Sequence, residues 1–156
     1  MSDPISLEIT VTPKADGNWV FSNEDQPVEL KIAKGKSAKL TYKIVTDEDG
    51  WSFAENGTFF TEAQDNFNYN LSSEVSKDHR SVTVTIQAVS LEHTISSEQL
   101  QKLMAEPTIA MPMELTHNHN SKVDFRLVAE NETINEGIRY FSQDPRVIID
   151  EPDVPV

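Results

Sequence analysis

The chain of 156 residues contains no cysteine. This excludes a disulfide-stapled scaffold, a thiolate nucleophile and any zinc site that uses cysteine. No run of the sequence approaches the ~18 apolar residues that a membrane-spanning helix needs. With five glycines the chain has no phosphate-binding loop and no Gly-x-Gly-x-x-Gly motif, and it also lacks a Gly-x-Ser-x-Gly nucleophile elbow. We therefore expect a protein that is not an enzyme and that uses no cofactor.

Basic residues are also scarce. Thirteen Lys and Arg face 26 Asp and Glu, which gives a formal net charge of -13. Affinity for a phosphate backbone comes from clustered Lys and Arg, so we expect neither nucleic acid nor an anionic membrane surface as a partner. The acidity favours solubility and suits a basic partner or a bound cation. The first residues lack the basic and apolar regions of a signal peptide, which predicts a cytoplasmic location.

Residues branched at Cβ dominate what is present. Val, Ile and Thr total 36, against 18 for Ala and Leu, and this branching favours strands over helices. Apolar and polar residues alternate with the period of two that marks a strand with one buried face. The clearest alternation predicts strands at residues 5–12, 28–32, 39–44, 81–88 and 122–129. Weaker alternation predicts strands at residues 19–21, 51–53, 58–61, 67–71, 138–141 and 146–149.

The other segments predict one helix, one interrupted strand and several loops. Ser96 and Gln99 fit a capping box and Pro107 ends the pattern, which predicts a helix at residues 97–105. Residues 108–115 alternate like a strand, but Pro112 lacks an amide hydrogen, so we expect an edge strand or a bulge there. Loops are predicted at residues 46–50, 72–80 and 116–121.

These elements predict an all-β domain over residues 1–152 with a short flexible tail at residues 153–156. Short alternating strands between turn signals favour an antiparallel β-sandwich of Ig-like or jelly-roll architecture, with a small barrel as another possibility. Parallel strands are usually apolar on both faces, so the alternation favours antiparallel pairing. We expect the two tryptophans in the core and three methionines as core filler, namely Trp19, Trp51, Met104, Met111 and Met113.

Two histidines form a candidate metal site. His117 and His119 are two residues apart, and such residues point to the same side of a strand. This spacing suits Zn²⁺ or another transition metal, whose site needs a third and often a fourth ligand. The sequence does not choose among the candidates for those positions, which are Glu114, Asp124, His79 and His93. An exposed polar loop explains the same two histidines.

Three asparagines form a candidate carbohydrate site. Asn66, Asn68 and Asn70 share one face of a predicted strand, and Phe67, Tyr69 and Leu71 share the other. Amide side chains beside aromatic ones can bind sugars. A solvated strand face explains the same alternation, and it is the simpler interpretation.

The C-terminal segment places an apolar strand between two acid–proline pairs, Asp144-Pro145 and Glu151-Pro152. A proline before a strand sets φ, and one after it stops the ladder. These four residues are therefore predicted to bound a final strand and to have a structural role.

The same segment resembles the signature of the bacterial DP-EP family. Together with the preceding Tyr140-Phe141, it is also similar to the end of the AidA/PixA inclusion-body proteins. The resemblance implies a bacterial protein, and it implies no catalytic residues.

Regular strands without a catalytic constellation indicate a module that binds a protein partner or associates with itself. The edge strand expected at residues 108–115 would offer unpaired backbone groups to a strand of the partner. The alternatives are a metal-binding protein that uses His117 and His119, and a carbohydrate-binding module.

Overall fold

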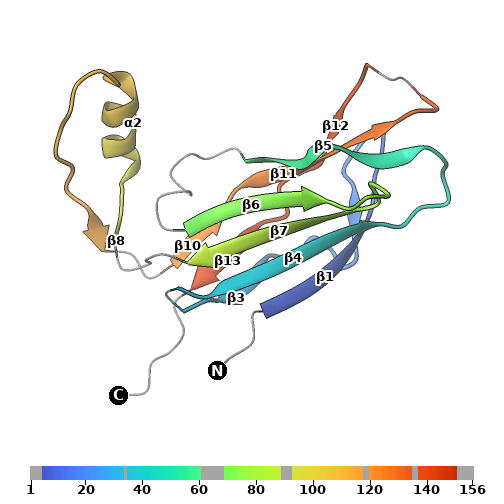
Figure 1. The fold of residues 1–156 in the computed structure, drawn as a ribbon, viewed down its shortest axis with the longest axis horizontal. Helices are drawn as coiled ribbons and strands as arrows, with labels where there is room; N and C mark the ends of the chain where they lie inside the picture. The colour runs from blue at the N-terminus through green and yellow to red at the C-terminus, as the bar shows by residue number, and fades with distance from the viewer. Residues whose placement is uncertain are drawn as a thin grey trace.

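The computed structural model describes residues 5–33, 35–60, 69–88, 93–117, 120–134 and 137–150. These residues form a mostly β structure with one short helix and several mostly antiparallel sheets, none of them closed. The largest sheet has the strand order β2-β1-β4-β7-β6 (Figure 1). Its strands are β1 (Ile5–Thr12), β2 (Val20–Phe21), β4 (Ser37–Ile44), β6 (Tyr69–Val75) and β7 (Ser81–Ala88).

Two further sheets have three strands each, and two stretches of the chain contribute strands to both sheets. One has the order β12-β11-β5 and the other β10-β13-β3, and in Figure 1 β3, β10 and β13 lie behind the large sheet. Their strands are β3 (Val28–Lys31), β5 (Trp51–Phe60), β10 (Asn120–Val123), β11 (Phe125–Asn131), β12 (Tyr140–Phe141) and β13 (Val147–Asp150). Two ladders are parallel, β1 with β4 and β3 with β13, whereas the alternation predicted antiparallel pairing. Alternation indicates only that one face of a strand is buried, and this holds for parallel as well as for antiparallel strands.

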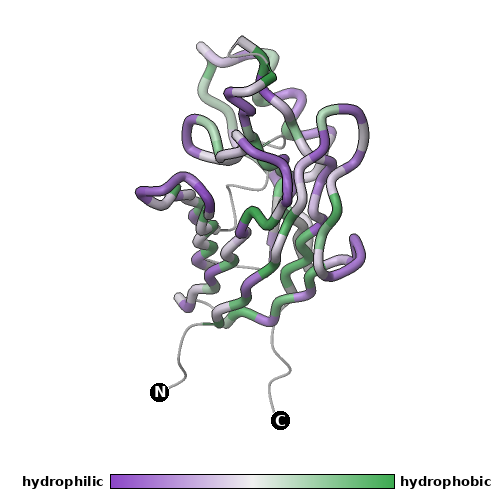
Figure 2. The backbone as a smooth tube through the Cα atoms, turned by 90° about the vertical axis from the view of Figure 1, so that its right-hand side faces the viewer, coloured by the Kyte–Doolittle hydropathy of each residue, from purple (hydrophilic) through white to green (hydrophobic). Residues whose placement is uncertain are grey.

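The core collects the inward faces of these sheets. Apolar and polar residues alternate along the strands in Figure 2, as the sequence predicted. A ring contact joins the large sheet to the β12-β11-β5 sheet: Tyr42 meets Phe125 at a centroid distance of 6.0 Å. Within the second sheet, Phe125 meets Phe60 at 5.6 Å. Trp19 and Trp51 are both buried, which confirms their predicted place.

The strands predicted separately at residues 51–53 and 58–61 form the single strand β5. The turn-like residues between them lie within the strand, where the pairing of β5 with β11 is irregular. Gly57 in this part of the strand has φ +82. A β-carbon at Gly57 would lie 2.7 Å from Val82 Cγ2, so glycine lets the strand pass this close to β7. The structural reason for glycine is thus an approach between sheets, which sequence spacing does not reveal.

Residues 93–117 leave the sheets as a separate lobe, which we call the excursion (Figure 1). It contains β8 (His93–Thr94), α2 (Ser97–Ala105) and β9 (Thr116–His117). The helix has the predicted bounds, and the Ser96 hydroxyl accepts from the Gln99 N–H at 3.3 Å. Gln99 does not return to the cap, as a full capping box requires. Its Oε1 accepts from the Glu114 N–H at 2.9 Å and ties the helix to the returning chain.

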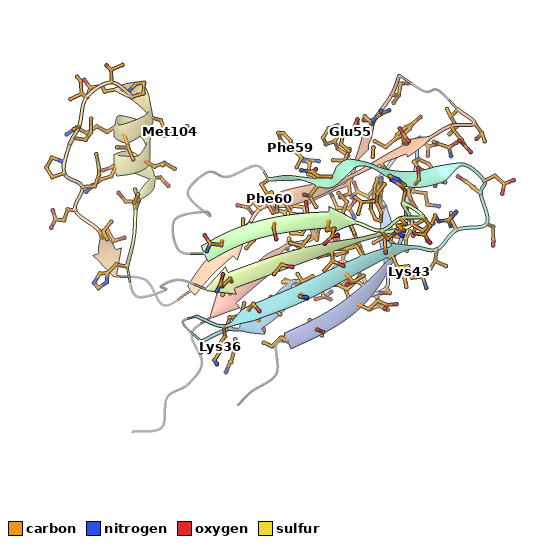
Figure 3. All side chains as sticks on the ribbon, in the orientation of Figure 1. Lys36, Lys43, Glu55, Phe59, Phe60 and Met104 are labelled. Carbon is orange, nitrogen blue, oxygen red and sulfur yellow. The ribbon has the colours of Figure 1, made fainter. Side chains whose placement is uncertain are left out.

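Two predictions for the excursion were wrong. Residues 108–115 are irregular backbone and form no edge strand. Met104, expected in the core, is 62% exposed and lies on the helix, away from the sheets (Figure 3). None of the described side chains of the excursion is buried, because no sheet lies beneath them.

Two loop predictions also missed strands. β6 extends through residues 72–75, and β9 and the start of β10 lie within residues 116–121. In β6 an inward position holds Ser73, whose hydroxyl bonds the Thr58 hydroxyl at 2.8 Å and the Asn56 carbonyl at 3.0 Å. A polar side chain satisfied in this way breaks the apolar alternation without ending the strand. No helix in the described part of the chain has the length and apolar character that crossing a membrane requires.

Candidate functional site

The candidate site lies where a long antiparallel ladder is interrupted. β10 and β11 are separated by Asp124, and β12 and β13 are separated by residues 142–146. β11 pairs with β12 and β10 with β13, so the same two stretches run side by side on both sides of the break. Backbone groups inside the break need other partners, because a buried unpaired N–H or C=O is costly.

Side chains supply part of that pairing. Ser142 is fully buried, and its hydroxyl accepts from the Leu127 N–H at 2.8 Å. Its own N–H donates to the Leu127 carbonyl at 2.9 Å. Gln143 Oε1 accepts from the Trp19 N–H at 3.0 Å, and Gln143 Nε2 donates to the Trp19 carbonyl at 2.9 Å. The alternation of the sequence does not identify Ser142 or Gln143 as buried partners, because a polar residue between two strands is normally expected to be exposed.

Asp144 joins the two sides of the break. Its Oδ1 accepts from the Arg146 N–H at 2.8 Å, and the carboxylate also accepts from the Phe125 N–H. The first bond closes a turn around the buried Pro145, and Arg146 leaves it with φ +57. Asp144 and the buried Pro145 thus lie in the turn that directly precedes β13.

The Asp144 carboxyl is also hydrogen-bonded to the Asp124 carboxyl. Burial, followed by this contact with a second acid, raises the pKa of Asp144 to about 6, although two backbone N–H donors act in the opposite direction. The neighbouring Asp124 carboxyl therefore adds to the cost of ionising Asp144.

A cleft of about 640 Å³ opens at this pair. It is lined by Asn18, Asp25, Pro27, Asp124, Gln143, Asp144, Arg146, Val147 and Ile148. The Arg146 guanidinium donates to the Asp25 carbonyl across the cleft wall. Of the residues that line the cleft, Asp25 has a buried acceptor, Oδ1, without a hydrogen-bond donor within the described structure. The cleft therefore offers more acceptors than donors.

The negative charge of Asp144 also acts on Tyr42 in the core. Burial raises the pKa of its hydroxyl, and the negative charge of Asp144 adds to this effect. Its Oη is a further buried polar atom that lacks a partner in the part of the chain described. The raised pKa keeps the Tyr42 phenol protonated near neutrality.

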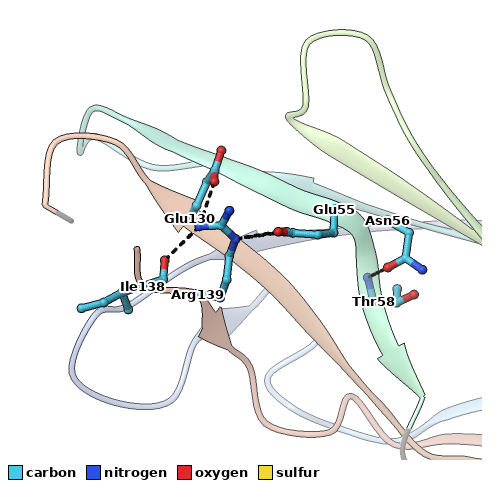
Figure 4. A network of polar contacts seen from close by, with 6 residues as sticks. All are labelled: Glu55, Asn56, Thr58, Glu130, Ile138 and Arg139. Atoms are coloured by element: carbon cyan, nitrogen blue, oxygen red, sulfur yellow. Dashed lines mark hydrogen bonds and ion pairs between the residues drawn. The ribbon is translucent and has the colours of Figure 1, made fainter. Parts of the chain in front are cut away.

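A second polar cluster lies on β5, β11 and the chain entering β12 (Figure 4). Arg139 Nε is 3.0 Å from Glu55 Oε1, and Arg139 Nη1 is 3.1 Å from Glu130 Oε2. These side chains are largely in contact with solvent, where ion pairs contribute only about 0–1 kcal/mol. The cluster holds residues 138–139 against the sheet, and it satisfies its own charges.

Comparison with known proteins identifies the family of the chain. The model of the DP-EP family matches residues 5–112. The chain belongs to the DP-EP family. The match ends before Asp144, so it rests on other residues than those that suggested the family. No curated protein and no solved structure matches this DP-EP chain. The similarity to AidA/PixA proteins and the bacterial source stay predictions.

The predicted metal ligands of this DP-EP protein are only partly described. His117 lies in β9, directly opposite His93 of β8 in the ladder register, and His119 lies outside the described residues. The described part of the chain holds no cluster of three or more His, Asp or Glu placed for a metal ion. Of the other candidate ligands, Asp124 lies in the cleft and His79 is exposed in the turn between β6 and β7. Glu114 lies in the excursion.

The remaining candidates are divided in the same way. Asn70 is exposed on β6 opposite Gln87 of β7, which agrees with a solvated strand face. Asn66 and Asn68 lie outside the described residues, as do Glu151 and Pro152. The sequence named Asp124 and Asp144 for unrelated reasons, as a metal ligand and as a strand boundary. Their contact depends on the pairing of β10 with β13, which no spacing in the sequence reveals.

Proposed function

We propose that this DP-EP protein is a non-enzymatic binding module that holds a lysine side chain of a partner protein in its acidic cleft. The observation that carries the proposal is the hydrogen bond between the Asp124 and Asp144 carboxyls in the wall of the cleft. A cation placed there would replace the proton of Asp144 and favour its ionised form. The net charge of -13 would draw a basic partner toward this surface.

The surplus of acceptors favours an ammonium group in particular. An ammonium has three N–H donors and no acceptor. Asp25 Oδ1 has no donor within the described structure, and the Asp124 and Asp144 carboxylates place further acceptor oxygens in the same cleft. The Arg146 guanidinium already donates to the Asp25 backbone carbonyl beside them. Any cationic ligand meets this positive charge, and a compact ammonium group needs less space beside it than a planar guanidinium. The cleft therefore suits a compact ammonium group better than a second guanidinium.

We infer further that the sheets of this module form an Ig-like sandwich. One layer would be β2-β1-β4-β7-β6, and the other would combine β12-β11-β5 with β10-β13-β3 through their shared chain. The common core and the Tyr42–Phe125 ring contact support this arrangement. The cleft would then lie at the break in the second layer.

The module would bind another protein in preference to itself. The edge strand expected to mediate self-association at residues 108–115 is irregular backbone. A net charge of -13 on every copy also opposes contact between copies at low salt. A strictly monomeric protein in sedimentation at low and high salt is the expected result.

The binding test uses a labelled decapeptide of alternating lysine and glycine, with the same peptide fully acetylated on lysine as the control. Each bound ammonium displaces one proton, so affinity should rise by about tenfold per pH unit up to about pH 6 and then level off. Asp124→Asn keeps the shape of the pair and removes one charge, and it should weaken binding. Asp47→Asn, an exposed residue in the loop before β5, makes the same charge change and is the matched control.

Two results would contradict the proposal. Equal weakening by Asp124→Asn and Asp47→Asn would mean that the peptide senses only the net charge of the protein. Binding that does not change between pH 5 and pH 6 would mean that the peptide does not compete with the proton of the pair.

A further inference from the structure

We propose that Asn56 is a site of covalent modification, where attack by the Gly57 backbone nitrogen converts the side-chain amide to aspartate and isoaspartate. Asn56-Gly57 is the only Asn-Gly pair in the sequence. The pair lies in β5 and does not line the acidic cleft, so the modification is independent of the proposed binding function.

The reaction needs no reagent other than water. The Gly57 nitrogen forms a bond to Asn56 Cγ, and the bond from Cγ to the side-chain nitrogen breaks. That nitrogen leaves as ammonia and takes the proton of the Gly57 N–H, so a five-membered cyclic imide remains. Water opens the imide at either carbonyl, which leaves aspartate or isoaspartate. Glycine favours the attack, because it has no side chain that obstructs the approach of its nitrogen.

The structure places the attacking nitrogen outside the regular ladder. The pairing of β5 with β11 stops at Phe53 and resumes at Thr58, so residues 54–57 lie between the two paired segments. Glu55 has φ +53 and Gly57 has φ +82, and both values lie in the left-handed region. A residue with a side chain is strained in this conformation. The main chain therefore reaches the imide without breaking ladder pairs with β11.

A hydrogen bond holds the Asn56 side chain over the residues that follow it (Figure 4). Its Oδ1 accepts from the Thr58 N–H at 3.3 Å, and the ring that this bond closes contains both Asn56 Cγ and the Gly57 nitrogen. The same N–H stabilises the negative charge that develops on Oδ1 when Cγ is attacked. Asn56 is exposed, so water reaches the imide. The local geometry therefore favours both steps.

The modification would change the contact between β5 and β6. The Ser73 hydroxyl of β6 donates to the Asn56 carbonyl at 3.0 Å and bonds the Thr58 hydroxyl at 2.8 Å. Isoaspartate adds one methylene group to the main chain between these two contacts, and either product adds a negative charge beside Glu55. We expect faster amide exchange in β5 and β6 of the modified protein, because the two strands no longer fit at this point.

The test is incubation of the purified full chain at mildly alkaline pH, followed by digestion and mass spectrometry. The peptide that contains Asn56 should acquire the mass of an acid in place of an amide, and it should separate into two products on chromatography. The rate should rise with pH, because the attacking nitrogen must lose its proton.

Asn131 is the matched control within the same sample. Its Oδ1 accepts from the Thr133 N–H at 2.9 Å in the same way, but Asn131 is buried and Glu132 follows it. Asn56 should convert at least about tenfold faster than Asn131, since small differences in the approach of the reacting atoms have effects of this size. Equal conversion of the two asparagines would overturn the proposal.

The contribution of the fold is measured against the same chain unfolded in guanidinium chloride. Asn56 should convert at least as fast in the folded protein, because the bond from Thr58 already holds the side chain in place. Asn56→Gln keeps an amide but requires a larger ring, so conversion at this position should be lost. An Asn56 that stays intact in the folded protein and converts only in the unfolded chain would overturn the proposal, since the fold would then protect it.

Discussion

The sheets and the excursion are built from the same kinds of residues but are held together by different forces. In the sheets, large apolar side chains such as Trp51, Tyr42 and Phe125 are at most 1% exposed. In the excursion, Met104 is 62% exposed and none of the described side chains is buried. The excursion is held by local hydrogen bonds, which include the Ser96 cap and the bond between Gln99 and Glu114.

This difference separates two sources of structure. A strand is stabilised when another sheet covers one of its faces, so its apolar and polar residues must alternate. Whether the strand forms therefore depends on residues that are distant in the sequence. The helix of the excursion forms because a capping residue and good helix formers follow one another along the chain. We expect the two regions to unfold with very different free energies, since local opening follows local packing.

The largest effect should come from truncating the core. Phe125→Ala removes a ring that contacts both Tyr42 and Phe60, and it should lower the free energy of unfolding by about 3–5 kcal/mol. Met104→Ala, in the excursion, should change it by less than about 0.5 kcal/mol. Urea denaturation followed by tryptophan fluorescence measures both. A comparable loss from Met104→Ala would show that the excursion packs on the sheets in solution.

An intermediate effect should come from the acidic pair. Folding raises the pKa of Asp144 to about 6, so the folded protein binds a proton that the unfolded chain releases near pH 4. The contribution of this group to stability is therefore complete below pH 4 and is lost as the pH rises through about 6. After discounting for its half-exposed position, the loss should be about 1–2 kcal/mol.

Asp124→Asn should reduce that loss, because it removes the negative charge beside Asp144, while burial, the largest cause of the raised pKa, remains. The variant should be more stable than the natural chain at pH 7 and should vary less between pH 4 and pH 6. Denaturant titrations at several pH values check this. Lower stability of Asp124→Asn at pH 7 would mean that the Asp124 charge is used in another contact that outweighs the repulsion.

The smallest global effect should come from the helix cap. Ser96→Ala removes the hydroxyl that accepts from Gln99, and it should cost the helix about 1 kcal/mol. Amide exchange in residues 97–105 should accelerate, while the unfolding midpoint of the whole protein stays unchanged. Ser97→Ala, one residue inside the helix, serves as the control and should change neither. A lowered midpoint in Ser96→Ala would mean that the unfolding of the excursion is coupled to the unfolding of the sheets.

The candidate site shows how far sequence reasoning reaches. Asp144-Pro145 stands out in the sequence because an acid and a proline precede an apolar run, and in the structure it lies in the turn before β13. Its partner Asp124 does not stand out in a chain with 26 acidic residues. Ser142 and Gln143 give no signal at all, since their hydrogen bonds reach residues that only the fold makes neighbours.

By itself, the sequence determined the elements whose cause is local. The helix at residues 97–105 follows from its cap and its stop, and the clearest strands follow from alternation with a period of two. The tertiary structure alone decided the parallel pairing of β1 with β4, the contact of Asp124 with Asp144 and the register that sets His93 opposite His117. Each of these depends on which strands become neighbours, and strand pairing is chosen by burial of the whole core rather than by any one segment.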